Sequence, residues 1–260
     1  MAKNRVVLIL VDGMRPDGMM EAQTPNMDKI MANGQFTLKA KTVMPSVTLP
    51  VHMSLFHSVK PDRHNNLTNT YAPQVRPIPG LMDVVHQQAK SAAMFYNWEQ
   101  LRDLSRPGSL AASVYFAVNG AGIGDSDHEI TVQAIDWLTS HECHLAFLYL
   151  GQTDEVGHRN GWMSPEYIEA IQQADACIGQ VMDALGDQVH YIVTADHGGH
   201  DNMHGTPLKV DMKIPLLMSG PKIPAQGKFE RKVSILDIAP TITKILKVKA
   251  PKEWRGTSLL

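Results

Sequence analysis

The chain consists of short apolar runs separated by segments with helical periodicity. The apolar runs occupy residues 5–11, 36–43, 92–96, 145–150, 189–194 and 214–218. Their hydrophobicity is continuous rather than alternating, which is typical of strands that are covered on both faces. Helical patterns lie between them at residues 25–33, 80–89, 127–139, 165–185 and 234–246. Because strands alternate with helices, we expect an α/β fold, a three-layer sandwich with a mostly parallel central sheet and helices on both faces.

Several of these helices have recognisable ends. Thr24 is the expected cap of the first, and Gly34 ends it. Ser164 and Pro165 begin the longest one. Pro240 lies inside the last pattern, which is therefore expected to be kinked or split.

Length and composition limit the classes of protein. A chain of 260 residues can form one large domain. We expect a single domain over residues 1–260, with the irregular residues 97–125 as a small cap or loop excursion. The net charge of −2 comes without a basic face, which argues against binding to a nucleic acid polymer. Two isolated cysteines, Cys143 and Cys177, are too few for a disulfide framework.

The N-terminal sequence bears on the cellular location. Only six apolar residues precede Asp12, which is too short for the core of a signal peptide. No apolar stretch is long enough to span a bilayer. We therefore expect a cytoplasmic protein without a membrane anchor, and the sequence leaves its oligomeric state open.

The segment 194–205 has an unusual density of metal-binding side chains. Five carboxylates and imidazoles fall within nine residues, namely Asp196, His197, His200, Asp201 and His204. Zinc accepts both ligand types, and the adjacent glycines allow the sharp turns that bring neighbouring side chains together. Because the segment directly follows a buried strand, it predicts a hydrolytic metal centre.

Other candidate ligands also follow predicted strands. Asp12 closes the first strand, and Asp154 and His158 come after residues 145–150, one helical turn apart. Taken alone, Asp12-Gly13 is an ordinary turn and the Asp154/His158 spacing is common by chance. Functional groups of α/β sheets gather beyond the carboxyl ends of strands, and this shared placement favours one site.

Thr48 lies between Pro45 and Pro50, just before an apolar helical pattern. Its simplest role is a helix cap. The alternative interpretation is that Thr48 is a nucleophile at a helix N-terminus, where backbone N–H groups and the helix dipole favour an alkoxide and a bound phosphate. A threonine hydroxyl is hardly ionised at neutral pH, so this role needs a metal. Ser46 is the alternative nucleophile.

Five motifs occur in a familiar order. They are Asp12-Gly13, Pro45-x-x-Thr48-x-Pro50-x-His52, Asp154-x-x-Gly157-His158, Asp196-His197-Gly198 and His204-Gly205. Together they resemble the alkaline phosphatase superfamily, and within it the type I phosphodiesterase/nucleotide pyrophosphatase branch. The similarity runs from the first strand to about Pro221. Only a few residues separate the last two motifs, where larger members carry a long insertion, so the elements that enclose the substrate are reduced.

The resemblance implies an alkaline-phosphatase-like fold and two zinc ions, with manganese as an alternative metal. One ion would be held by Asp12, Thr48, Asp196 and His197, and the other by Asp154, His158 and His204. His200 is the alternative to His204. Asn69 matches the position from which the family donates a side-chain N–H to a nonbridging phosphate oxygen.

The implied activity is hydrolysis of phosphodiester or pyrophosphate bonds in a small-molecule phosphate ester, through a phosphothreonine at Thr48. A phosphomonoesterase or phosphonate hydrolase on the same scaffold is the main alternative. A mutase is less favoured, because it would need a large cap for which this chain has no room. A sulfatase is also less favoured, because neither cysteine lies in a Cys-x-Pro-x-Arg context. The non-enzymatic alternative is a zinc-stabilised scaffold protein, although a structural zinc is usually closed by four ligands.

Overall fold

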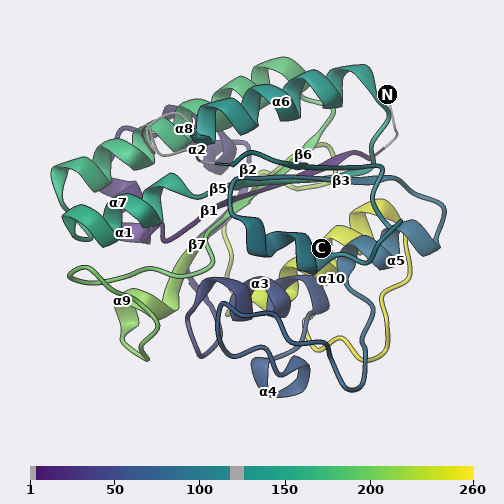
Figure 1. Cartoon of the computed structure of the whole chain (residues 1–260). Helices are drawn as coiled ribbons and strands as arrows, with labels where there is room; N and C mark the ends of the chain where they lie inside the picture. Colours follow the sequence, from purple (N-terminus) through teal and green to yellow (C-terminus); the bar gives the residue numbers. More distant parts are fainter. Residues whose placement is uncertain (1–3, 118–125) are drawn as a thin grey trace.

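The computed structural model describes residues 4–117 and 126–260, and a single eight-stranded sheet runs through these ranges (Figure 1). The strands are β1 (Val6–Val11), β2 (Gly34–Lys41), β3 (Ala92–Tyr96), β4 (Ala112–Tyr115), β5 (Leu145–Leu150), β6 (His190–Thr194), β7 (Lys213–Ser219) and β8 (Gly227–Lys228). Their order across the sheet is β4-β3-β5-β1-β6-β7-β2-β8. Strand β7 is antiparallel to both of its neighbours, and all other pairs are parallel.

Helices cover both faces of the sheet (Figure 1). One layer contains α1 (Pro16–Glu21), α2 (Pro25–Ala32), α6 (Ser126–Ser140), α7 (Gln152–Asn160) and α8 (Pro165–Leu185). The opposite layer contains α3 (Thr48–His57), α4 (Pro61–His64), α5 (Leu81–Gln87) and α10 (Ile238–Leu246). The short elements are α9 (Lys209–Met212), which precedes β7, and the 3₁₀ helices η1 (Glu99–Leu104) and η3 (Ile235–Asp237). The α/β sandwich predicted from the alternation of strands and helices is therefore confirmed.

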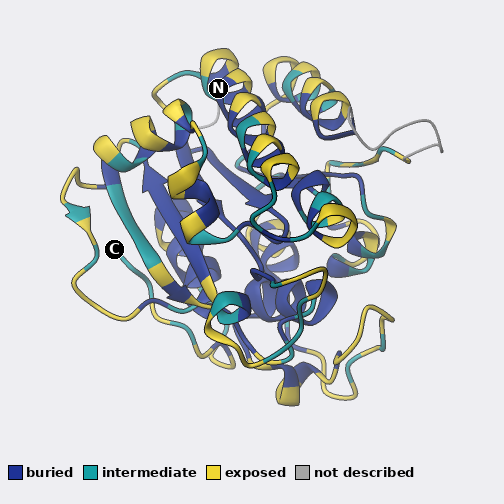
Figure 2. Ribbon diagram, turned by 90° about the vertical axis from the view of Figure 1, so that its left-hand side faces the viewer, coloured by how far each residue is buried: buried dark blue, intermediate teal, exposed yellow. Residues whose placement is uncertain are grey.

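The core lies between these layers, around the central strands. Every residue of β1, β5 and β6 is buried, and Figure 2 shows these strands enclosed by helices whose outer faces are exposed. In the parallel pairing, Val6 lies opposite Leu145 on one side and opposite His190 on the other. The three strands therefore end side by side at the same edge of the sheet.

Most predicted elements are present, with shifted ends. The strand expected at 36–43 is β2, which begins two residues earlier, and helix α8 has the predicted bounds. The last helical pattern is split, as expected, but the break precedes Ile238. Pro240 lies in the first turn of α10, where its missing N–H is tolerated. Strands β4 and β8 were not predicted, because both are short edge strands without a continuous apolar run.

The cap or loop excursion expected at residues 97–125 falls partly on residues 118–125, which lie outside the described residues. Its described part contains η1 and β4. Both cysteines are buried and free. In the described part of the chain, every helix is too short or too polar to cross a bilayer.

Candidate metal centre

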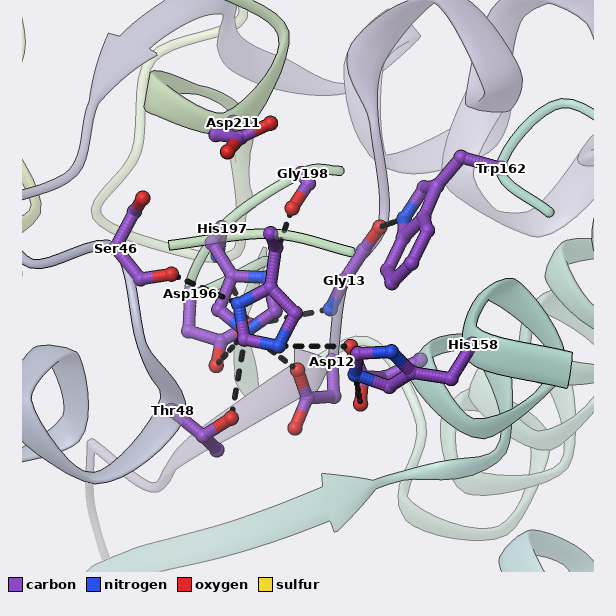
Figure 3. A network of polar contacts seen from close by, with 12 residues as sticks. Asp12, Gly13, Ser46, Thr48, His158, Trp162, Asp196, His197, Gly198 and Asp211 are labelled. Carbon is purple, nitrogen blue, oxygen red and sulfur yellow. Dashed lines mark hydrogen bonds and ion pairs between the residues drawn. The ribbon is translucent and has the colours of Figure 1, made fainter. Parts of the chain in front are cut away.

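Three neighbouring strands carry the predicted ligands to one place. Asp12 directly follows β1, Asp154 lies in the first turn of α7 after β5, and Asp196 and His197 follow β6. Because β5, β1 and β6 are adjacent and parallel, their carboxyl ends coincide. Figure 3 shows the side chains of Asp12, Thr48 and His197 converging there. The structure thus brings these segments together at one edge of the sheet.

Thr48 reaches the site from the start of helix α3. Val47 is the N-cap of this helix and makes no side-chain cap hydrogen bond, so Thr48 is its first helical residue. The Thr48 hydroxyl oxygen lies 3.3 Å from His197 Nε2. His52 Nδ1 lies 2.7 Å from the Thr48 carbonyl oxygen and donates to it. The simple role of Thr48 as a helix cap is therefore wrong, and its hydroxyl faces the other candidate ligands.

The three histidines among the proposed ligands have their tautomers fixed by the backbone. In each, Nδ1–H donates to a main-chain carbonyl, which leaves the lone pair on Nε2. The three bonds, each 2.9 Å long, run from His158 to Asn202, from His197 to Gly198 and from His204 to Ser46. Their Nε2 atoms are therefore oriented as acceptors, the form in which histidine binds a metal.

Carboxylate oxygens face these same Nε2 atoms. His197 Nε2 lies 3.3 Å from Asp12 Oδ1 and 3.3 Å from Asp196 Oδ2. Asp154 Oδ2 lies 3.4 Å from His158 Nε2, and Asp154 Oδ1 lies 3.7 Å from His204 Nε2. Lone pairs on nitrogen and oxygen therefore point toward one another, an arrangement that repels unless a cation lies between them.

Several carboxylate oxygens of the cluster also lack hydrogen-bond donors. Asp12 Oδ1, Asp154 Oδ1 and Asp196 Oδ2 are buried and accept no hydrogen bond from any described residue. A buried anionic oxygen without a donor is costly, and such groups normally pair with a cation or coordinate a metal. The donor set of carboxylates and imidazoles therefore fits borderline divalent ions such as zinc.

Burial also perturbs the protonation of these groups. It raises the pKa of Asp12 and of Asp154 well above the usual range, and neighbouring carboxylates raise both further. It raises the pKa of Asp196 to about 7 and lowers the pKa of His204 to about 3. Without a cation the site therefore favours neutral acids, and a divalent ion is what would keep the aspartates charged.

The choice between His204 and His200 has a geometric answer. The ligand atoms of Asp154, His158 and His204 lie within 4.8 Å of one another, as do those of Asp12, Asp154 and His197. His200 belongs to neither group, and its Nδ1 instead lies 2.8 Å from Oδ1 of the buried Asp211. The geometry favours His204 as the ligand.

The alternative nucleophile, Ser46, is occupied elsewhere. Its hydroxyl donates to the carbonyl oxygen of Thr206 at 3.0 Å, and its own carbonyl oxygen receives the His204 bond. Ser46 therefore holds the loop that carries His204, whereas Thr48 lines the cavity next to the cluster.

A cavity of about 390 Å³ opens beside the cluster. It is lined by Asp12, Thr48, Asn69, Asn97, Trp98, Ser126, Tyr149, Gly151, Gln152, Asp154, Glu155, His158 and His204. Asn69 Oδ1 accepts the backbone N–H of Leu49 at 3.0 Å, so its remaining polar group is the Nδ2 donor. The described residues that line this cavity include no lysine or arginine.

Sequence reasoning missed Tyr149, which contacts one of the proposed ligands. The Tyr149 hydroxyl donates to Asp12 Oδ2, and its position next to the end of β5 was the only available signal. Trp98 also lines this cavity. Arg15, close to Asp12 in the sequence, donates to Asp17 and to the Gly199 carbonyl oxygen.

Residues 6–215 match the family described as type I phosphodiesterase/nucleotide pyrophosphatase. Human ectonucleotide pyrophosphatase/phosphodiesterase family member 7 is 24% identical over 96% of this chain and 62% of its own length. The 2,3-bisphosphoglycerate-independent phosphoglycerate mutase of Staphylococcus epidermidis is 33% identical over 52% of this chain and 27% of its own length. The chain thus spans less than two thirds of these relatives.

A solved structure has the same fold. Murine ectonucleotide pyrophosphatase/phosphodiesterase 5, in an inactive threonine-to-alanine variant with AMP bound, superposes with a TM-score of 0.78 at 17% identity, over 97% of each chain. At this identity the likeness concerns the fold alone. The family match covers most of the chain and includes the strand ends that carry Asp12, Thr48, Asp154, Asp196, His197 and His204. The chain belongs to the type I phosphodiesterase/nucleotide pyrophosphatase family of the alkaline phosphatase superfamily.

Proposed function

We propose that the chain is a metal-dependent hydrolase that cleaves phosphodiester or pyrophosphate bonds in small phosphate esters through a threonine nucleophile. One observation carries the proposal: the Thr48 hydroxyl, at the wall of a cavity, lies 3.3 Å from His197 Nε2, in a cluster with buried carboxylate oxygens that have no hydrogen-bond donor among the described residues. The AMP complex of the murine relative, inactive when a threonine becomes alanine, supports the same chemistry.

Two zinc ions are the proposed cofactors, with manganese as an alternative. Asp12, Thr48, Asp196 and His197 would hold one ion, and Asp154, His158 and His204 the other. When bound, the ions would lower the pKa of the threonine hydroxyl and stabilise the charge on the leaving oxygen. The histidine ligands are already set in the required tautomer by their bonds to main-chain carbonyls.

Hydrolysis would proceed in two displacements. The Thr48 oxygen attacks phosphorus, its proton passes to solvent, and the bond from phosphorus to the alcohol or nucleotide breaks. Water then attacks the phosphothreonine from the opposite side and releases Thr48. Asn69, whose Oδ1 is held by the Leu49 N–H, presents Nδ2 to a nonbridging phosphate oxygen throughout.

The charge of the site favours a diester over a monoester. Three aspartates and two divalent ions give a formal charge of +1, which matches one negative charge on phosphate. No lysine or arginine among the described lining residues is available to neutralise a second. We expect faster hydrolysis of bis(p-nitrophenyl) phosphate than of p-nitrophenyl phosphate. A strong preference for the monoester would instead favour the phosphomonoesterase alternative.

Thr48→Ala tests the nucleophile. We expect this variant to fold and to bind zinc while kcat/KM for the diester falls by at least about 10³-fold, because the attacking atom is lost. Ser46→Ala is the matched control and should keep kcat/KM within about tenfold, since among the described residues the Ser46 hydroxyl bonds to Thr206 and Met44, and the bond to His204 comes from the Ser46 carbonyl oxygen, which the substitution retains. Undiminished activity of Thr48→Ala would assign the attack to another group.

A further inference from the structure

Trp162 lies behind the metal centre, in the turn between α7 and α8. Its side chain is 7% exposed, and its Nε1–H donates to the carbonyl oxygen of Gly13 at 3.0 Å (Figure 3). Its main-chain N–H donates to the carbonyl oxygen of Asp201 at 2.8 Å. Trp162 therefore bonds to the segment that follows Asp12 and to the segment that leads to His204.

Two glycines make room for the indole. A Cβ added at Gly157 would lie 2.7 Å from the Trp162 ring, and one added at Gly199 would lie 2.3 Å from it. The same three ring atoms, Cδ2, Cε2 and Cζ2, are the nearest in both cases. The indole is thus held between the helix that carries His158 and the loop that carries His204. A side chain at either Gly157 or Gly199 would collide with the ring.

The ring also contacts both imidazoles that belong to the second ligand group. Its centroid lies 5.0 Å from that of His158, with the planes at 84°, and 5.9 Å from that of His204, with the planes at 63°. These edge-on contacts add to the Nδ1 bonds in setting the ring orientation. His197, which belongs to the first group, stacks on His204 rather than on Trp162.

We infer that Trp162 is a positioning residue that fixes His158 and His204 relative to Asp154 and so determines the metal affinity of that second site. The inference rests on the proposed two-metal centre. In this role Trp162 supports the metal-binding segments and does not itself contact the metal. We expect its effect to be larger at this second site than at the first. The ring contacts His158 and His204 directly, whereas it reaches the first group through its bond to the carbonyl oxygen of Gly13, whose N–H donates to Asp196.

The test is a direct measurement of zinc binding. The apoprotein is titrated with zinc against a chromophoric chelator, and bound metal is counted by mass spectrometry after dialysis. Wild type should bind two ions. In Trp162→Leu, we expect the affinity of one site to fall by about 10–100-fold, the range for lost supporting contacts around a metal, while the affinity of the other site falls by less.

Trp254→Leu is a closely matched control. Trp254 is also 7% exposed, and its indole N–H also donates to a main-chain carbonyl at 3.0 Å, that of Pro79. The variant should lose thermal stability to a similar degree and still bind two zinc ions with wild-type affinities. If Trp254→Leu lost one zinc in the same way, the effect of Trp162 would be general destabilisation and the inference would be overturned.

Gly199→Ala tests the same contact with Trp162 retained, in case Trp162→Leu does not fold. The new Cβ displaces the indole, so the affinity of the same single site should fall, and adding Trp162→Phe should restore part of it because a smaller ring leaves space. Two unchanged sites in both Trp162→Leu and Gly199→Ala would refute the inference and leave the proposed function intact. A wild-type protein that binds no zinc would refute both.

Discussion

At the scale of single residues, the site is defined by atoms that lack suitable partners. Sequence reasoning found the carboxylates and imidazoles because they follow apolar runs. It did not find what orients them. The Nδ1 bonds of His158 and His204 end on carbonyls that no sequence pattern marks, such as that of Ser46 for His204, 158 positions away. The choice between His200 and His204 therefore needed the structure.

Tyr149→Phe tests one such support. Removing the hydroxyl leaves Asp12 Oδ2 without its donor, so we expect zinc affinity to fall by about 10–100-fold. Tyr191→Phe is the control, because Tyr191 is equally buried and its hydroxyl donates to the Gly186 carbonyl oxygen, outside the site. Zinc titration of both variants measures the difference, and equal affinities would show that Asp12 does not depend on Tyr149.

At the scale of elements, local signals predicted some segments and missed others. Helix α8 was predicted with correct bounds because its cap works as the sequence indicates: Ser164 Oγ accepts the Tyr167 N–H at 3.2 Å. Helix α7 was not predicted, because it is polar and contains Gly157. Its N-terminus depends on a distant carboxylate, Asp127 in α6, which accepts the N–H groups of Gly151 and Gln152 at 2.9 and 3.2 Å.

Asp127 predicts a pH dependence of stability. Burial raises its pKa to about 6 from the ordinary 3.8, so the folded state binds its proton more tightly than the unfolded state. Protonation of Asp127 therefore stabilises the folded state relative to the unfolded state. This contribution is complete below about pH 4 and is lost as pH rises through 6. Without zinc, the free energy of unfolding of wild type relative to Asp127→Asn should therefore fall by up to about 3 kcal/mol between pH 4 and 7. Urea unfolding of both proteins measures this difference, and a constant difference would contradict it.

At the scale of the whole molecule, strand order creates the site. Parallel β5, β1 and β6 lie side by side, so residues as distant as Asp12 and Asp196 meet at one edge. The alternation of strands and helices predicted this class of fold. It did not predict the strand order or the antiparallel β7, because pairing depends on packing between segments far apart in the chain.

Metal removal tests this arrangement as a whole. Chelation should leave the negative charge of the buried aspartates uncompensated, and zinc at about 1,000 times the Kd of a site should add about 4 kcal/mol to the free energy of unfolding for each occupied site. For a chain of this size, that corresponds to a rise in Tm of about 10 °C. Calorimetry with EDTA and then with excess zinc measures the shift. An Asp154→Asn variant should show a smaller rise in Tm. A wild-type Tm that does not change when zinc is added would contradict the two-metal site.

The most direct measurement of the central claim is the stereochemical course at phosphorus. A chiral phosphorothioate diester hydrolysed in ¹⁸O-labelled water distinguishes one displacement from two. Attack by Thr48 followed by attack of water inverts phosphorus twice, so the account predicts net retention of configuration. Net inversion would mean that water attacks the substrate directly, and it would contradict the role proposed for Thr48.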